Sequence, residues 1–184
     1  RQVPASLGAV SIACALLLCT VSARAAPDAY GLGDGHAGSL VVSQAGLVVN
    51  AASRLSQAAS AGATQLFVVT PATFHAQDLV LIWHAAGSVG AAVGGSGPID
   101  LASSGIGGHE LARVVSVQAD RVTLDQPTTR AYPAGDAQLV FVPELSELQV
   151  HAGASLAALP WDAAQKRGGI LALLVQGEAR IEGL

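Results

Sequence analysis

Short aliphatic strands separated by a glycine-containing turn occur three times along the chain, at residues 39–49, 147–156 and 173–184. A strand pair of this kind cannot bury its apolar face alone and must stack on a neighbour, as one rung of a β-solenoid does. The pattern therefore predicts an all-β chain that contains the first rungs of a right-handed parallel β-solenoid, with further rungs beyond residue 184. The alternative is three unrelated strands of an ordinary β-domain.

The residues between the first two repeats predict a separate β-module. Five short strands are expected in it, at residues 65–70, 78–84, 110–117, 121–125 and 137–142. The second of these is apolar on both faces, which is typical of a central buried strand. Short strands separated by Gly and Pro indicate a small barrel or sandwich.

The two strands at residues 110–125 are expected to form a hairpin around the polar turn 118–120. Simple alternation places Leu111, Val115 and Val117 on one face of its first strand, and Ala112, Val114 and Ser116 on the other. The last strand of the module is followed by Pro143, which cannot donate to a ladder and suits a strand end.

A Gly-rich loop over residues 85–108 precedes this hairpin. Loops of such length are either functional or mobile. The string 94–98, GGSGP, approaches the Gly-x-Ser-x-Gly pattern of a nucleophilic serine but lacks its last glycine, and Ser103-Ser104-Gly105 lacks its first. Neither stretch supports a catalytic serine.

The first 25 residues have the three parts of a secretory signal peptide. Arg1 is basic, residues 7–21 are mostly apolar, and Ala23-Arg24-Ala25 has the small-x-small pattern of a cleavage site. We expect a signal-peptide helix, cleavage after Ala25, and a secreted, outer-membrane-surface or periplasmic protein without a stable membrane span. A retained anchor is the alternative, but the apolar run is shorter than the roughly 20 residues that a span needs.

Both cysteines of the chain, Cys14 and Cys19, lie within the predicted signal. The mature protein would therefore contain no thiol. This excludes a disulfide framework, cysteine zinc sites and cysteine nucleophiles.

Charge excludes a further class of partner. Without Arg1 and Arg24, 7 basic residues face 13 acidic ones, a net charge of about −6. The chain has no basic patch interleaved with aromatic residues, so nucleic acid is not an expected partner.

These patterns divide the chain into four parts: a signal peptide at residues 1–25, a Gly-rich lead-in and first rung at 26–50, the inserted β-module at 51–143, and the start of the β-solenoid at 144–184.

The lead-in contains the candidate metal ligands. Gly33, Gly35 and Gly38 match a dinucleotide-binding fingerprint, but no βαβ unit surrounds them, so the match carries no cofactor prediction. Asp34 and His36 stand between these glycines, and an Asp in a Gly-rich turn offers oxygen ligands to Ca²⁺. Whether a metal binds near Asp34 stays open, because a simple turn at the start of the first rung explains the same residues.

Other polar residues predict no chemistry. The five histidines lack zinc-site spacing, and the adjacent pair His109-Glu110 is expected to be two exposed residues at the start of a strand. Arg113 is expected on the exposed face of the hairpin. No catalytic or cofactor-binding residue is predicted.

Two further polar pairs flank the second repeat. Glu144 and Glu147 are the closest pair of carboxylates and are expected in a solvated turn. Trp161-Asp162 is expected to cap the flank of the solenoid.

The strand series resembles a short β-module of large exported bacterial proteins and of phage tail proteins. The residues that carry the likeness are AGATQLFVV at 61–69, DLVLI at 78–82, ELARV at 110–114 and VTLDQP at 122–127, with Ala131-Tyr132. Together with GDGHAG at 33–38, HAGASL at 151–156, Trp161-Asp162 and GGIL at 168–171, they make residues 30–184 similar to the N-terminal region of the large secreted myxobacterial proteins called adventurous gliding motility protein AgmC.

The resemblance implies a long surface protein that continues as repeats and is linked to surface motility. It implies no catalytic residue. His109 departs from the family, which often has a larger polar or aromatic residue there.

The sequence thus predicts an exported cell-surface or envelope protein, structural or adhesive in role, without catalysis in this segment. Surface polysaccharide and other envelope proteins are its expected partners. The alternative is the N-terminal part of a carbohydrate-active β-helix enzyme with its site downstream, while a phage tail-fibre module is disfavoured by the signal peptide.

Overall fold

The computed structural model describes residues 31–87 and 104–182 of the chain. The predicted signal peptide and most of the Gly-rich loop lie outside this part. The elements named within it are strands and one 3₁₀ turn, η1 (Pro71–Thr73), so the fold is all-β as predicted. The strands are β1 (Ser39–Val42), β2 (Leu47–Val48), β3 (Ala52–Arg54), β4 (Gln65–Phe67), β5 (Leu79–His84), β6 (His109–Gln118), β7 (Arg121–Leu124), β8 (Ala137–Val142), β9 (Glu144–Leu145), β10 (Glu147–Val150), β11 (Leu156–Ala157), β12 (Leu174–Val175) and β13 (Ala179–Ile181).

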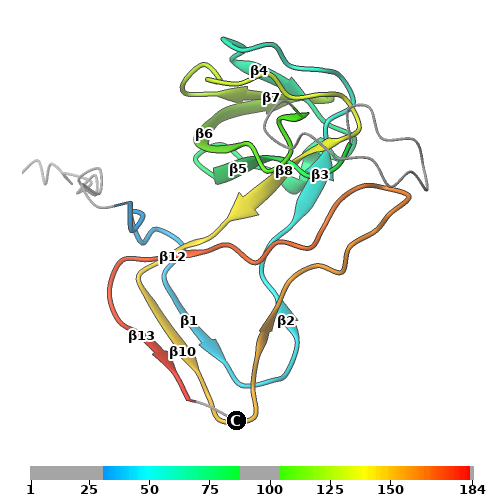
Figure 1. Ribbon diagram of the computed structural model, residues 1–184. Coiled ribbons are helices and arrows are strands. Elements are labelled where there is room, and N and C mark those ends of the chain that lie inside the picture. Colours follow the sequence, from blue (N-terminus) through cyan, green and yellow to red (C-terminus); the bar gives the residue numbers. More distant parts are fainter. Residues whose placement is uncertain (1–30, 88–103, 183–184) are drawn as a thin grey trace, which may run out of the picture.

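Seven strands form three small parallel sheets in the lower part of Figure 1. The sheets are β1-β10-β13, β2-β11 and β9-β12. Their inward side chains form one apolar core, whose buried members are Val42, Leu145, Leu148, Val150 and Ala154. Successive passes of the chain therefore stack on one another and share a core that no single pass could enclose.

The predicted equivalence of the first two repeats is confirmed residue by residue. Ser39 pairs with Glu147 and Val42 with Val150, and in the next sheet Leu47 pairs with Leu156. The apolar columns continue from one pass to the next because equivalent residues pair in parallel.

The third repeat is placed one strand differently from the prediction. Its first strand, β12, pairs with β9, while its second strand, β13, pairs with β10. Strands β12 and β13 thus lie in two different sheets, and the first repeat supplies a strand, β1, to only one of these two. Two-residue strands look alike in sequence, so the pattern could not distinguish which sheet each one joins.

The inserted residues fold into one antiparallel sheet in the order β3-β8-β5-β6-β7-β4. Its central strand β5 pairs with both β6 and β8 and is buried along nearly its whole length, which confirms the prediction of a two-sided buried strand. The sheet curls until its edges meet, because Leu55 bridges Val68 just beyond β3 and β4. Strand β3 was not among the five predicted strands. The curled form favours the barrel over the sandwich.

The inner face of this curled sheet encloses the larger core. Its biggest fully buried side chains include Tyr132, Leu55, Leu66, Ile82 and Leu139.

A β-bulge corrects the alternation expected for β6. The register shifts between Val114 and Ser116, which leaves Val115 51% exposed and turns Val117 toward the core with Ala112. An extra residue in one strand reverses the faces beyond it, so Val115 and Val117 do not share a side.

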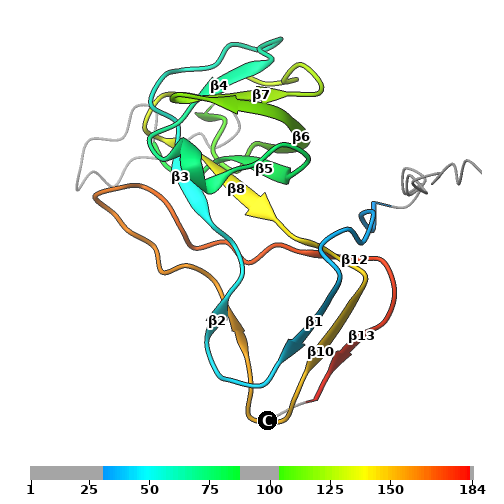
Figure 2. The same ribbon diagram turned by 180° about the vertical axis from the view of Figure 1, so that it is seen from behind.

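The outer face of the curled sheet is covered by residues 158–173, which we call the strap; Figure 2 shows it running beneath β3 and β8. Apolar strap residues such as Leu159 and Ile170 pack against Leu79, Leu81 and Val140. Because the strap connects β11 to β12, it ties the antiparallel sheet to the parallel ones.

Two buried amide side chains fasten the strap. The Gln138 side chain donates to the Gly168 carbonyl at 3.0 Å and accepts from the Gly168 N–H at 2.8 Å. Asn50 makes the same reciprocal pair with Ala172. Each side-chain amide pairs with both the N–H and the carbonyl of one strap residue, as a neighbouring strand would. The buried backbone of the strap therefore stays hydrogen-bonded.

Candidate functional site

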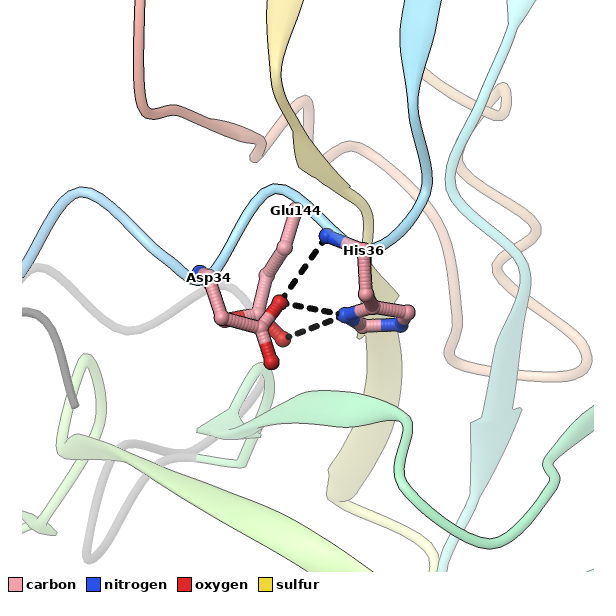
Figure 3. A group of neighbouring side chains, drawn as sticks. All are labelled: Asp34, His36 and Glu144. Atoms are coloured by element: carbon pink, nitrogen blue, oxygen red, sulfur yellow. Dashed lines mark hydrogen bonds and ion pairs between the residues drawn. The ribbon is translucent and has the colours of Figure 1, made fainter. Parts of the chain in front are cut away.

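A charged cluster lies where the lead-in, the curled sheet and the parallel sheets meet. It contains Asp34, His36, Arg113 and Glu144. Asp34 and His36 come from the turn before β1, Arg113 from β6, and Glu144 is the first residue of β9. Figure 3 shows the Asp34, Glu144 and His36 side chains converging.

Glycines in the lead-in allow this approach. A Cβ on Gly33 would lie 3.0 Å from Cγ of Glu144, and Gly33 has a φ of +83°. A side chain there would be strained by the backbone and would collide with the buried carboxylate. The glycine string that imitates a nucleotide fingerprint thus serves close backbone packing against Glu144.

Glu144 is buried and fully hydrogen-bonded. Its exposed fraction is 1%. The Arg113 guanidinium donates from Nη1 to Oε2 at 2.7 Å and from Nη2 to Oε1 at 2.9 Å, and the Asp34 N–H donates to Oε1 at 3.1 Å. The expectation that Glu144 lies in a solvated turn was wrong, because the Arg113 side chain reaches it across the sheet.

Arg113 was expected on the exposed face of the hairpin, but its side chain is only 28% exposed. Its Nη1 additionally donates to the Gln77 carbonyl at 2.8 Å, and its backbone N–H donates to Asp125 Oδ1 at 2.9 Å. The hydrogen bonds to Glu144 raise the pKa of Arg113, so its positive charge is held at this position.

Asp34 and His36 form the solvent side of the cluster. The His36 Nδ1 lies 2.5 Å from Asp34 Oδ1 and 3.5 Å from Glu144 Oε2. Burial acts to raise the pKa of the Asp34 carboxyl, but the hydrogen bonds from His36 and the nearby charges of His36 and Arg113 outweigh it and hold that pKa below its usual value.

The metal-ligating capacity of this cluster is limited by Arg113. One donor atom each from Asp34, His36 and Glu144 lies within 4.8 Å of the others. Both Glu144 oxygens, however, already accept from a guanidinium, and a cation placed there would face that positive charge. The sequence left metal binding near Asp34 open, and the arrangement itself is that of an ion-pair network joining three parts of the chain.

The remaining sequence candidates lie apart from this cluster. His109 stacks on Trp83 with ring centroids 5.1 Å apart. Glu110 accepts hydrogen bonds from the Thr129 N–H and hydroxyl at 2.8 and 2.9 Å. Both residues lie at the start of β6 as expected, with His109 exposed and Glu110 partly buried, and each has a structural contact that the sequence did not indicate.

Glu144 and Glu147, which are close in sequence, do not form a pair in the structure. Glu147, unlike Glu144, is exposed, and it lines a shallow outer groove. In the strap, Asp162 accepts from the Ala164 and Gln165 N–H groups and closes a turn beside Trp161, which is 45% exposed.

The sequence could have indicated the Arg113–Glu144 pair in one way. Each is a single charge in or next to an otherwise apolar strand, and opposite charges in such settings require partners. Nothing in the spacing of 31 residues identified them as partners of each other.

No protein-family model matches the chain, and no curated protein matches it by sequence. Solved structures resemble part of it, among them three phage tailspikes. They are the gp54 tailspike of Acinetobacter baumannii bacteriophage AP22 in complex with A. baumannii capsular saccharide (12% identity, TM-score 0.39, 61% of this chain and 19% of that one), the tailspike gp61 of Pseudomonas phage phi297 (14%, 0.35, 62% and 19%) and the tailspike gp49 of Pseudomonas phage LKA1 (15%, 0.37, 65% and 26%).

The chain spans about a fifth to a quarter of the length of these tailspikes. Likenesses at these TM-scores establish neither a shared function nor a shared site. Within the described residues, no helix has the length and apolar character needed to cross a membrane.

Proposed function

We propose that this chain is part of an exported cell-surface or envelope protein with a structural or adhesive role, linked to surface motility. Its parallel sheets are the first rungs of a right-handed β-solenoid, and the curled sheet is a module inserted after the first rung. Surface polysaccharide and other envelope proteins are its partners, and the segment carries no catalysis.

The observation that supports this proposal most is the parallel stacking of successive passes. Leu148 pairs with Leu40 on one side and with Ala179 on the other, and Val150 pairs likewise with Val42 and Ile181. Such columns of equivalent residues are how a solenoid extends. A long, rod-like scaffold of this kind suits a surface protein better than a compact enzyme.

The charged cluster supports a structural role as well. Arg113, Glu144, Asp34 and His36 all have partners within the cluster. A group held in this way is suited to fixing the inserted module onto the first rungs, because loss of the Arg113 guanidinium would leave the buried Glu144 carboxylate without its charge partner.

Export is tested by expressing the chain in a Gram-negative bacterium and determining the N-terminus of the product by mass spectrometry. We expect a product that begins at Ala26 and that added protease degrades on intact cells or in the periplasmic fraction. The control is residues 26–184 alone, which should stay in the cytosol. An uncleaved, cytosolic full chain would contradict the proposal.

One observation favours the alternative, a carbohydrate-active β-helix enzyme. Glu147 and Glu178 directly precede paired residues of β10 and β13, so two carboxylates follow each other on the outer face beside Arg180. They line a groove of about 200 Å³. Two carboxylates on one solenoid face, one acting as acid and the other as base or nucleophile, are what glycoside cleavage would need.

This alternative is tested by incubating the chain with neutral and acidic polysaccharides and measuring new reducing ends. We expect none. Turnover that is lost in Glu147→Gln and Glu178→Gln but kept in Glu182→Gln would establish the enzyme instead.

A further inference from the structure

A pocket of about 580 Å³ opens at the end of the curled sheet, away from the charged cluster. It lies where β5 ends and β8 begins, since His84 is the last residue of β5 and pairs with Ala137 of β8. Its walls are Ala58, Ala59, Ser60, His84, Gly87, Ser104, Gly105, Ala131, Tyr132, Pro133 and Asp136. This volume falls within the usual range for small-ligand sites, which often occupy the mouths of curled or closed sheets.

His84 is the unusual member of this wall. The residue is only 8% exposed, yet its imidazole makes no hydrogen bond with any residue that the structure describes. Buried polar groups are almost always hydrogen-bonded, so an imidazole that faces a pocket and has no partner among the described residues is suited to hydrogen-bond a ligand.

Two glycines keep the polar side of the pocket open. A Cβ on Gly105 would lie 3.1 Å from His84 Nδ1, and a Cβ on Gly87 would lie 2.9 Å from Asp136 Oδ2. Both glycines have positive φ angles, +71° and +102°. Any larger residue would crowd the imidazole or the carboxylate that borders the pocket.

The wall has two different sides in chemical terms. Hydrogen-bonding groups come from Ser60, His84, Ser104 and Asp136, while Ala58, Ala59, Ala131, Tyr132 and Pro133 contribute apolar surface. Asp136 is paired with the Lys166 ammonium, so the wall carries no net charge there and favours a neutral ligand over an ion, while a wholly apolar ligand would leave His84 without a partner. A pyranose ring suits both sides, because it carries hydroxyl groups at its edge and C–H groups on its faces.

We propose that this pocket binds a neutral sugar residue, with His84 as its principal hydrogen-bonding group. The choice of a sugar as ligand rests on the proposed surface role with polysaccharide as partner. The pocket and the imidazole that faces it are observed independently of that role. This places recognition in the inserted module and leaves the parallel sheets as its scaffold.

The test is a titration of the isotope-labelled full chain followed by NMR of the histidine ring signals, with His84 assigned through His84→Gln. The probes are methyl α-D-glucopyranoside, methyl β-D-galactopyranoside, N-acetylglucosamine and methyl α-L-rhamnopyranoside. We expect a saturable shift of the His84 signals with at least one probe, with a Kd on the order of 1 mM.

Two variants and one control define the site. His84→Gln should weaken binding about tenfold or more, measured on the ligand signals. Ala131 is exposed, so Ala131→Leu should keep the fold. Its larger side chain narrows the pocket, so this variant should also lose sugar binding. His75→Gln, whose side chain is 79% exposed, should bind as the wild type does.

Absence of a saturable shift with all four sugars up to about 100 mM would overturn the inference, as would binding that Ala131→Leu leaves intact. The export assay does not involve the pocket. Loss of sugar binding with correct export therefore rejects only the sugar site, and failed export with intact binding rejects only the surface role.

Discussion

Arg113 donates two hydrogen bonds to the two carboxylate oxygens of Glu144, across 31 residues of chain and between two different sheets. The guanidinium is partly exposed, whereas the carboxylate is almost completely buried. The pair joins the curled sheet to the parallel sheets at the point where the chain passes from β8 to β9. Its geometry is the two-point contact that favours Arg over Lys for recognising a carboxylate.

Removing the guanidinium should destabilise the protein. Arg113→Met leaves the Glu144 carboxylate buried without its charge partner, and we expect a loss of about 3 kcal/mol in the free energy of unfolding, measured by urea titration with circular dichroism. The double variant Arg113→Met/Glu144→Gln should lose less, because no buried charge remains. Arg121→Met, at the end of the hairpin, is the control and should change stability by less than about 0.5 kcal/mol. Equal effects of Arg113→Met and Arg121→Met would contradict a structural role for the pair.

Asp34 should make stability depend on pH in the acid range. Its pKa in the folded protein lies below the ordinary value of 3.8, so the carboxylate stabilises the fold fully above pH 3.8, and this contribution disappears as the pH falls further, through the folded-state pKa. Asp34→Asn should therefore be less stable than the wild type at pH 6, and the difference should shrink below pH 3.8. Urea titrations of both proteins at pH 6 and below pH 3.8 measure this difference in the free energy of unfolding. A difference that stays constant would show that Asp34 contributes only through its shape.

Replacing Gly168 should destabilise the protein by more than its positive φ alone would cause, because an earlier part of the strap passes close to its Cα. A Cβ at Gly168 would lie 2.4 Å from the Pro160 carbonyl oxygen and 2.8 Å from that of Leu159, whereas a Cβ at Gly153 meets nothing within 4 Å. Both glycines have positive φ, so both Ala variants lose about 1 kcal/mol from backbone strain.

Gly168→Ala should lose roughly 2 kcal/mol more, because the strap must move away from the curled sheet. Chemical denaturation of the two variants compares them directly. Similar stabilities would mean that the strap adjusts freely and does not fix the two parts together.

The bulge in β6 predicts opposite outcomes for two valines two positions apart. Val117 packs against the inner core and Val115 is 51% exposed. Val117→Thr should reduce stability by about 1 kcal/mol, since it brings a hydroxyl toward the apolar core. Val115→Thr should change it by less than about 0.5 kcal/mol. Thermal melts of both variants distinguish them, and equal losses would argue for regular alternation without the bulge.

Much of the architecture could be read from local patterns. The parallel pairing of β1 with β10 followed from the like arrangement of aliphatic residues in 39–42 and 147–150. The central place of β5 followed from its being apolar on both faces. These features are repeated or continuous along the chain, so hydrophobic patterning alone is sufficient to predict them.

The exceptions share a physical cause. The bulge at Val115, the pairing of β12 with β9 and the covering of the curled sheet by the strap each depend on where a distant segment lies. A two-residue strand or a single inserted residue changes the local pattern very little. Which partner it meets is decided by packing over the whole core.

The sequence by itself determined that the chain is all-β, that it repeats and that it carries an inserted module, because these follow from the order of apolar and turn residues. Only the tertiary structure decided that Arg113 and Glu144 are partners, and that His84 faces a pocket with no side-chain partner among residues 31–87 and 104–182. A charge or an imidazole has the same appearance in a sequence whether it is solvated, paired or buried. Its chemistry is set by neighbours that the fold brings from elsewhere in the chain.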